Sequence, residues 1–150
     1  MSCPTSWSGK CSSFGGATDK GVGPQEGLGL IELPDLSEWW FSRLFNQDSI
    51  ENGMGLARSL NTNAFYCAMR FAYTSFQGVQ GEILPGYTRE QVRRGQFTIC
   101  KQAGGPAIWA TAADWGPNLD TGRLIDCSPG ILTALGAQTD DQLLVSFIEA

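Results

Sequence analysis

The alternation of hydrophobic and polar positions predicts short β-strands separated by glycine-rich turns. The clearest strand pattern is AFYCAMRFAY (64–73), where Phe65, Cys67, Met69 and Phe71 fall on one face. Tyr66, Arg70 and Tyr73 fall mostly on the other face. FTICKQ and AIWATAAD are joined by AGGP, a composition that predicts a hairpin. Strands are also expected around 10–14, at 124–126 and at 142–149, and residues 26–33 are expected to form a strand or a buried connection.

Helical spacing is confined to short segments. LPDLSEWWFSRLF (33–45) places its apolar residues near helical spacing, which predicts one helix. Two adjacent tryptophans on a short helix cannot both face one core. Either one of Trp39 and Trp40 is exposed to a partner, or both lie beneath inserted loops. Shorter helical segments are expected at 55–60 and 88–94, and residues 46–55 are expected to form a loop.

The segment AADWGPNLDTGRLIDCSPGILTALG (112–136) carries the most specific local chemistry. Ser128 has the position of a helix N-cap, Pro129 that of the first helical residue and Gly136 that of the residue after the helix. Asp126 therefore lies at a strand end beside the positive end of a helix, and we expect it to stay ionised. Asp114 follows an apolar run, and partial desolvation is expected to raise its pKa.

Composition and charge exclude several classes of protein. The 150 residues suffice for one domain with a hydrophobic core, and a hydrophobic content of 42% excludes a disordered chain. A net charge of −5 without a basic run argues against a nucleic-acid partner. No apolar stretch is long enough to span a membrane. The N-terminal residues lack the pattern of a signal peptide, which predicts synthesis in the cytoplasm.

The cysteines and the missing histidines limit the chemistry further. Five cysteines (Cys3, Cys11, Cys67, Cys100, Cys127) form no CxxC pair, and the chain has no histidine, so no metal site and no cofactor are expected. Cys67 and Cys100 lie in apolar runs and are expected to be buried small hydrophobes. Cys3 and Cys11 are close enough in sequence to pair across a short loop, which the sequence leaves open.

Two motifs resemble the double-psi β-barrel domains of the RlpA and expansin type. DWGPNLDTGRLIDCSPGILTALG (114–136) resembles their closing motif, and GKCSSFGG (9–16) is similar to their opening strand. LARSLNTNAFYCAMRF (56–71) matches their second barrel strand. The resemblance implies a single mostly β domain over residues 1–150. Its core would be a six-stranded double-psi barrel, mostly antiparallel, with one to three short helices and insertions at about 33–55 and 74–95.

The resemblance also implies a polysaccharide groove. Its residues would be Asp114 and Asp126 as catalytic carboxylates and Ser12 and Trp115 as substrate contacts. RlpA-type members act on peptidoglycan and expansins loosen plant cell-wall polymers, so peptidoglycan is the expected partner. One departure weakens the case for cleavage. RlpA-type members that cleave use a histidine near the start of the second barrel strand, and the stretch around Leu56–Leu60 offers no equivalent.

Three functions stay open at this point. The first is a polysaccharide-directed module, with or without weak lytic transglycosylase activity based on an aspartate acid/base. The second is a non-enzymatic component of a phage virion or tail, in contact with other virion subunits. The third is a small inhibitor or interaction barrel. An open acidic groove with a stacking tryptophan favours the first of these.

Overall fold

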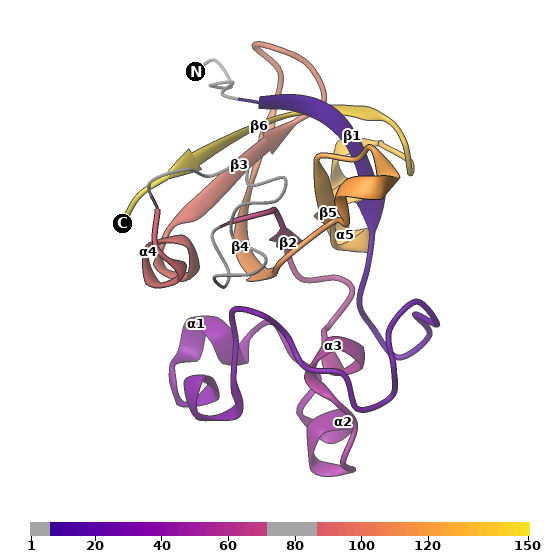
Figure 1. The fold of residues 1–150 in the computed structure, drawn as a ribbon, viewed down its shortest axis with the longest axis vertical. Helices are drawn as coiled ribbons and strands as arrows, with labels where there is room; N and C mark the ends of the chain where they lie inside the picture. Colours follow the sequence, from indigo (N-terminus) through magenta and orange to yellow (C-terminus); the bar gives the residue numbers. More distant parts are fainter. Residues whose placement is uncertain (1–6, 72–86) are drawn as a thin grey trace.

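The described part of the computed structural model, residues 7–71 and 87–150, is built around a closed six-stranded β-barrel (Figure 1). The strands follow one another around the barrel in the order β1-β5-β2-β4-β3-β6. This confirms the predicted fold class, a mostly β closed barrel with short helices. The strands are β1 (Trp7–Ser13), β2 (Tyr66–Ala68), β3 (Gln96–Cys100), β4 (Ala107–Asp114), β5 (Ile125–Cys127) and β6 (Gln142–Ile148).

Parallel and antiparallel pairs are mixed in the barrel. β1 pairs with β5 and β2 pairs with β4 in parallel, and the other four neighbouring pairs are antiparallel. The predicted hairpin is confirmed, because β3 and β4 pair in antiparallel register from Phe97↔Ala110 to Cys100↔Ala107. Two parallel neighbours cannot be joined by a tight hairpin, and in both parallel pairs the two strands are separated in the sequence by at least one other strand.

The barrel interior is filled by one continuous hydrophobic cluster. Tyr66, Phe71, Phe97, Ile99 and Ile125 are among its largest fully buried side chains. The strand predicted over residues 64–73 is confirmed only at its centre, because β2 spans three residues. Its predicted two faces are not seen, since residues 66–71 are all buried. Tyr73 and most of the second insertion, expected at about 74–95, lie outside the described residues. The structure describes this insertion only from residue 87 onward.

The cysteines behave as predicted only in part. Cys67 is a buried free thiol, as expected. It lies opposite Cys127, another free thiol, in the β-sheet register between β2 and β5. Cys11 is also a free thiol, so it does not pair with Cys3, which lies outside the described residues. Cys100 is buried but disulfide-bonded, which corrects its assignment as a simple hydrophobic residue.

The helices of the first insertion gather at one side of the barrel (Figure 1). Residues 33–45 do not form the single predicted helix. A 3-10 turn, η1 (Leu33–Ser37), and α1 (Trp39–Ser42) are separated at Glu38, whose backbone is extended. α2 (Gln47–Glu51) occupies part of the stretch predicted as a loop, so that prediction is wrong there. α3 (Leu56–Ser59) lies where a helical turn was predicted.

The remaining helices follow their capping signals. α4 (Arg89–Arg94) begins at a capping box in which Thr88 and Gln91 bond reciprocally. α5 (Pro129–Leu135) begins at Ser128, whose hydroxyl accepts a hydrogen bond from the Ile131 N–H at 3.2 Å. It ends at Gly136, which has φ 66°. Both helices were predicted, and a further 3-10 turn, η2 (Leu119–Thr121), precedes β5. The described residues hold five α-helices, none longer than seven residues.

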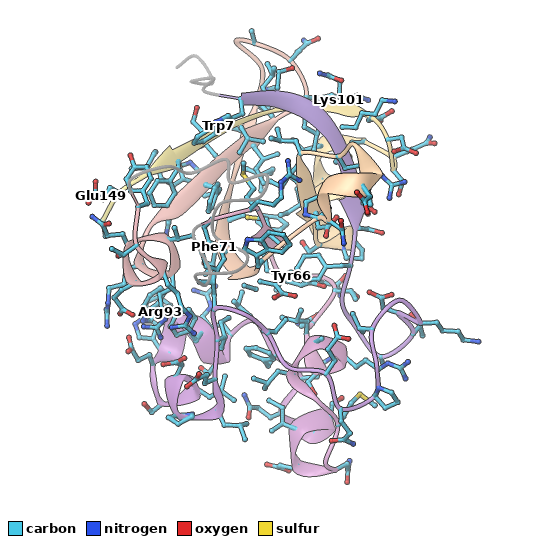
Figure 2. All side chains as sticks on the ribbon, in the orientation of Figure 1. Trp7, Tyr66, Phe71, Arg93, Lys101 and Glu149 are labelled. Carbon is cyan, nitrogen blue, oxygen red and sulfur yellow. The ribbon has the colours of Figure 1, made fainter. Side chains whose placement is uncertain are left out.

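Arg93 ties α4 to the first insertion. Figure 2 shows this side chain between α4 and α1. Its guanidinium forms an ion pair with Asp35 at 2.6 Å, donates to the Leu30 carbonyl at 3.2 Å and lies 4.9 Å from the centre of the Phe41 ring.

The segment predicted as a strand or a buried connection, residues 26–33, is a connection with Leu28, Leu30 and Ile31 buried. No helix among the described residues is long and apolar enough to cross a membrane.

Candidate functional site

One row of residues crosses four neighbouring strands of the barrel. Ser12 on β1 pairs with Asp126 on β5, Asp126 pairs with Ala68 on β2, and Ala68 pairs with Asp114 on β4. Neighbouring strands lie about 4.8 Å apart, which puts the Cα atoms of the two aspartates about 10 Å apart. The small Ala68 side chain separates them. The barrel therefore brings together two carboxyls and a hydroxyl that are far apart in the sequence.

A β-bulge between β2 and β4 sets the position of Asp114. Cys67 pairs with Ala112, but the next residue of β2, Ala68, pairs with Asp114, so Ala113 is the extra residue. The Ala113 carbonyl accepts a hydrogen bond from Leu30 N at 3.2 Å. Without the bulge, Ala113 would occupy the row and Asp114 would lie one residue beyond it. Bulges commonly redirect a side chain in this way beside functional sites.

The row opens into a cavity of about 650 Å³, which all four predicted site residues line. This size falls in the range of small-molecule and substrate sites. Ser12, Asp114, Trp115 and Asp126 thus meet at one place. Lining residues that the sequence analysis did not name include Asp19, Glu26, Asn118 and Arg123.

Asp114 is a half-buried carboxyl held by backbone amides. Its Oδ1 accepts hydrogen bonds from Gly29 N at 2.7 Å and from Trp115 N at 2.8 Å. Burial raises the pKa of Asp114 to about 6, although these two hydrogen bonds act in the opposite direction. The predicted effect of desolvation on Asp114 agrees with this value. Both hydrogen bonds end on Oδ1, so Oδ2 has no such partner among the described residues.

Asp126 differs from the expectation that it stays ionised. Burial, followed by the charges of Asp114 and Asp19, raises the pKa of Asp126 to about 7, while Arg123 and Arg70 act in the other direction. The N-terminal amides of α5 do not offset this, because Ile131 N bonds to the Ser128 hydroxyl and Gly130 N to the Thr62 carbonyl. In the described structure no hydrogen bond ends on the Asp126 carboxyl.

The turn after β4 leaves space for the Asp126 carboxyl. Gly116 has φ 147°, which favours glycine, and a Cβ atom added there would lie 3.4 Å from Asp126 Oδ2. A Cβ atom at position 116 would therefore be in van der Waals contact with the carboxyl, and the positive φ would strain the backbone of any residue other than glycine. This glycine lies in the segment 114–136 that resembles the closing motif of the double-psi barrels.

Two arginines support the site from opposite sides. Arg123 is paired with Asp140 at 2.8 Å, and its Nη1 lies 3.4 Å from the Ser12 hydroxyl, to which it donates. Arg70 is buried and donates to the carbonyls of Pro117 and Arg123 at 2.9 Å each, which fixes the turn between β4 and β5. Arg123 lies in the segment that resembles the closing motif, but the resemblance gave it no role. The sequence did hold a signal for Arg70, because it is a charged residue within an otherwise apolar run and buried charged side chains are usually paired.

Trp115 is fixed at the rim of the cavity. Its indole Nε1 donates to the Phe71 carbonyl at 2.9 Å, and the half-buried ring packs against the hydrophobic core.

The loop after β1 forms another wall of the cavity. There the Asp19 carboxylate accepts from Gly15 N at 2.7 Å and Gly21 N at 2.8 Å. Asp19 and the exposed Glu26 add negative charge, so among the described lining residues carboxyl groups outnumber arginines, of which there is one, Arg123.

No protein-family model matches this sequence, and no curated protein matches it significantly. Within the described residues, no group of three or more His, Cys, Asp or Glu side chains is placed to hold a metal ion. The cavity offers the carboxyls of Asp114 and Asp126, the Ser12 hydroxyl and the Arg123 guanidinium to a ligand.

Proposed function

We propose that the cavity is a polysaccharide-binding groove in which Asp126 and Asp114 act as acid/base groups on a glycosidic bond. The observation that carries the proposal is the pair of half-buried carboxyls in one row, both with a pKa near neutrality, at one cavity. An ordinary surface aspartate is fully ionised at pH 7 and cannot donate a proton. A carboxyl with a pKa near 7 can serve as a general acid at physiological pH.

The relation to double-psi β-barrels is part of the same proposal. A closed six-stranded barrel with two parallel pairs, β1·β5 and β2·β4, is consistent with that family. The two motifs that resemble the family also supply the residues of the row, Ser12 from the opening motif and both aspartates from the closing one. Peptidoglycan, on which RlpA-type members act, is therefore the first substrate to test.

The proposed chemistry uses only groups that the chain provides. The protonated Asp126 carboxyl donates its proton to the glycosidic oxygen, and the bond from this oxygen to the anomeric carbon breaks. A hydroxyl of the same sugar then attacks the anomeric carbon and forms an anhydro ring. Its proton passes to the carboxylate, which restores the starting state. This lytic transglycosylase route needs no histidine and no activated water.

The other residues would position the sugar. Asp114, held on Oδ1 by two amides, presents Oδ2 as a fixed acceptor for a sugar hydroxyl. Arg123 and Ser12 offer donors on the opposite side of Asp126. The Trp115 ring, immobilised by its bond to Phe71, offers a flat apolar surface at the rim.

Incubation of the purified protein with peptidoglycan sacculi tests the proposal. The soluble fraction is analysed by mass spectrometry for anhydro-muropeptides, and the pellet is assayed for bound protein. We expect wild-type protein to bind sacculi and release anhydro products. Asp126→Asn should abolish release and keep binding, and Asp114→Asn should weaken both. The exposed Asp48→Asn on α2 is the matched control and should behave as wild type.

Two results would revise the proposal. Binding without release by the wild type would make the protein a wall-targeting module and remove the catalytic part. Neither binding nor release would refute the groove and favour the alternative of a barrel kept for assembly.

A further inference from the structure

A second cleft, about 400 Å³ in volume, lies between α1 and the outer face of the barrel. Trp109 and Thr111 project outward from β4, two residues apart and so on the same face of the strand. Gln96 lies beside Thr111 at the start of β3, because the next residue, Phe97, pairs with Ala110. Phe65 lies on the other side, and its carbonyl accepts a hydrogen bond from Thr111 N at 3.2 Å.

Helix α1 forms the opposite wall of this cleft. Trp40 is held in place, because its Nε1 donates to Glu38 at 2.7 Å and its ring stacks on Phe41. Trp39 is 67% exposed, and the Arg43 guanidinium lies 5.2 Å from the centre of its ring. Of the two alternatives drawn from the sequence, the exposure of one tryptophan is therefore confirmed.

Large aromatic rings are unusually accessible here. Trp39, Trp109 at 50% and Phe65 at 38% are three of the five large hydrophobic residues exposed in the described structure, and all three line this cleft. An exposed cluster of this kind marks a binding site more often than chance packing. None of the three rings belongs to the core cluster of the described residues, whereas Tyr66 and Ala110, which follow Phe65 and Trp109 in the sequence, are buried in it.

The polar side chains of the cleft are equally informative. Arg43, Asn63, Gln96 and Thr111 line it, and among the described residues their side-chain polar atoms make no hydrogen bond with the protein. Hydrogen-bonding groups thus alternate with aromatic faces, as Thr111 does with Trp109 along β4. A ligand that matches this surface needs apolar faces to stack on rings and many hydroxyl or amide groups to bond between them.

We propose that this cleft binds an uncharged oligosaccharide, as a site separate from the acidic groove. A sugar ring presents C–H faces to an indole and hydroxyls around its edge, which fits the alternation of rings and polar groups. Arg43 is the only charged residue among the described residues that line the cleft, and the net charge of the chain is −5, so a nucleic-acid strand is a poor match. A protein partner would favour an apolar centre with a polar rim, whereas polar groups lie among the rings here.

Calorimetric titration with soluble tetrasaccharides tests this site. The probes are chitotetraose, cellotetraose and maltotetraose, followed in parallel by tryptophan fluorescence. We expect at least one probe to bind the wild type. Trp109→Ala and Trp39→Ala should each weaken binding by about tenfold or more. Trp109→Phe, which keeps a ring, should retain most of the affinity, and Gln96→Ala should reduce it. Leu33→Ala, at a residue 60% exposed outside the cleft, is the matched control.

The double variant Asp114→Asn/Asp126→Asn separates the cleft from the groove. It should bind the probe as the wild type does, whether or not the groove proposal survives. Failure of all three probes to bind would overturn the inference. So would binding that Asp114→Asn/Asp126→Asn abolishes and Trp39→Ala leaves intact. A concentration-dependent dimer in sedimentation velocity that Trp39→Ala dissolves, without sugar binding, would assign the cleft to self-association instead.

Discussion

The raised pKa of Asp126 predicts how the stability of the protein depends on pH. In the folded protein this carboxyl has a pKa of about 7, against about 3.9 for aspartate in an unfolded chain. The folded state therefore binds this proton more tightly, and the stabilisation is complete below pH 4 and lost as pH rises through 7. Each pH unit inside this window changes the free energy of unfolding by about 1.4 kcal/mol per carboxyl.

Between pH 5 and pH 8 the wild type should therefore lose about 2.5 kcal/mol of stability through Asp126 alone. Asp126→Asn cannot ionise and should lack this loss. Asp114, with a pKa of about 6, contributes a smaller loss of the same sign, which is present in both proteins and cancels in the comparison. Arginine partners lower the pKa of Glu90 and of Asp140, so these two groups titrate below the pH range compared.

Urea unfolding at pH 5 and pH 8, followed by tryptophan fluorescence, measures the effect. Asp48→Asn on α2 is the control and should follow the wild type at both pH values. Asp114→Asn should shift the titration of Asp126 to lower pH, because it removes the second cause of the raised pKa. Carboxyl ¹³C chemical shifts report this titration directly. If wild type and Asp126→Asn differ by the same amount at pH 5 and pH 8, within about 0.5 kcal/mol, the assigned burial of this carboxyl is wrong.

Two further predictions concern the framework around the site. Arg93→Met should reduce the free energy of unfolding, measured in urea at pH 7, by about 3 kcal/mol. The reason is that the substitution leaves Asp35 without its ion pair and removes the contacts that hold α4 to the first insertion. A loss below about 1 kcal/mol would contradict this role. Ser128→Ala should cost about 1 to 2 kcal/mol in the same assay, since the buried hydroxyl caps α5 at Ile131 N, and an unchanged urea midpoint would show that water replaces the cap.

Local sequence chemistry was sufficient to predict the elements that have their own start and stop signals. Ser128, Pro129 and Gly136 bound α5 as expected, and the capping residues of α4 do the same. The single helix predicted over residues 33–45 failed because its apolar spacing carried no information about Glu38. The extended backbone there lets the Glu38 carboxylate accept the Trp40 indole N–H, which splits the segment.

The same distinction applies to the site. The identity of its residues was what the motif resemblance implied. The ionisation of Asp126 was not predicted correctly, because it was inferred from the nearest element in sequence, the start of α5. In the structure the amides at Ile131 and Gly130 are occupied by Ser128 and Thr62, and burial, followed by the charge of Asp114, raises the pKa of Asp126. A pKa depends on neighbours in space, which a pattern along the chain does not contain.

The bulge at Ala113 is the step that turns two aspartates into one site. Along β4, more exposed residues alternate with more buried ones up to Ala112, and a regular ladder with β2 would continue to pair residue by residue. The hydrogen bond from Leu30 N to the Ala113 carbonyl and the one from Gly29 N to Asp114 Oδ1 hold the extra residue in place. The connection over residues 26–33 therefore does more than fill the core. By stabilising the bulge it brings Asp114 into the row of Asp126, and the repulsion between the two carboxylates then helps to keep a proton on Asp126 near neutral pH.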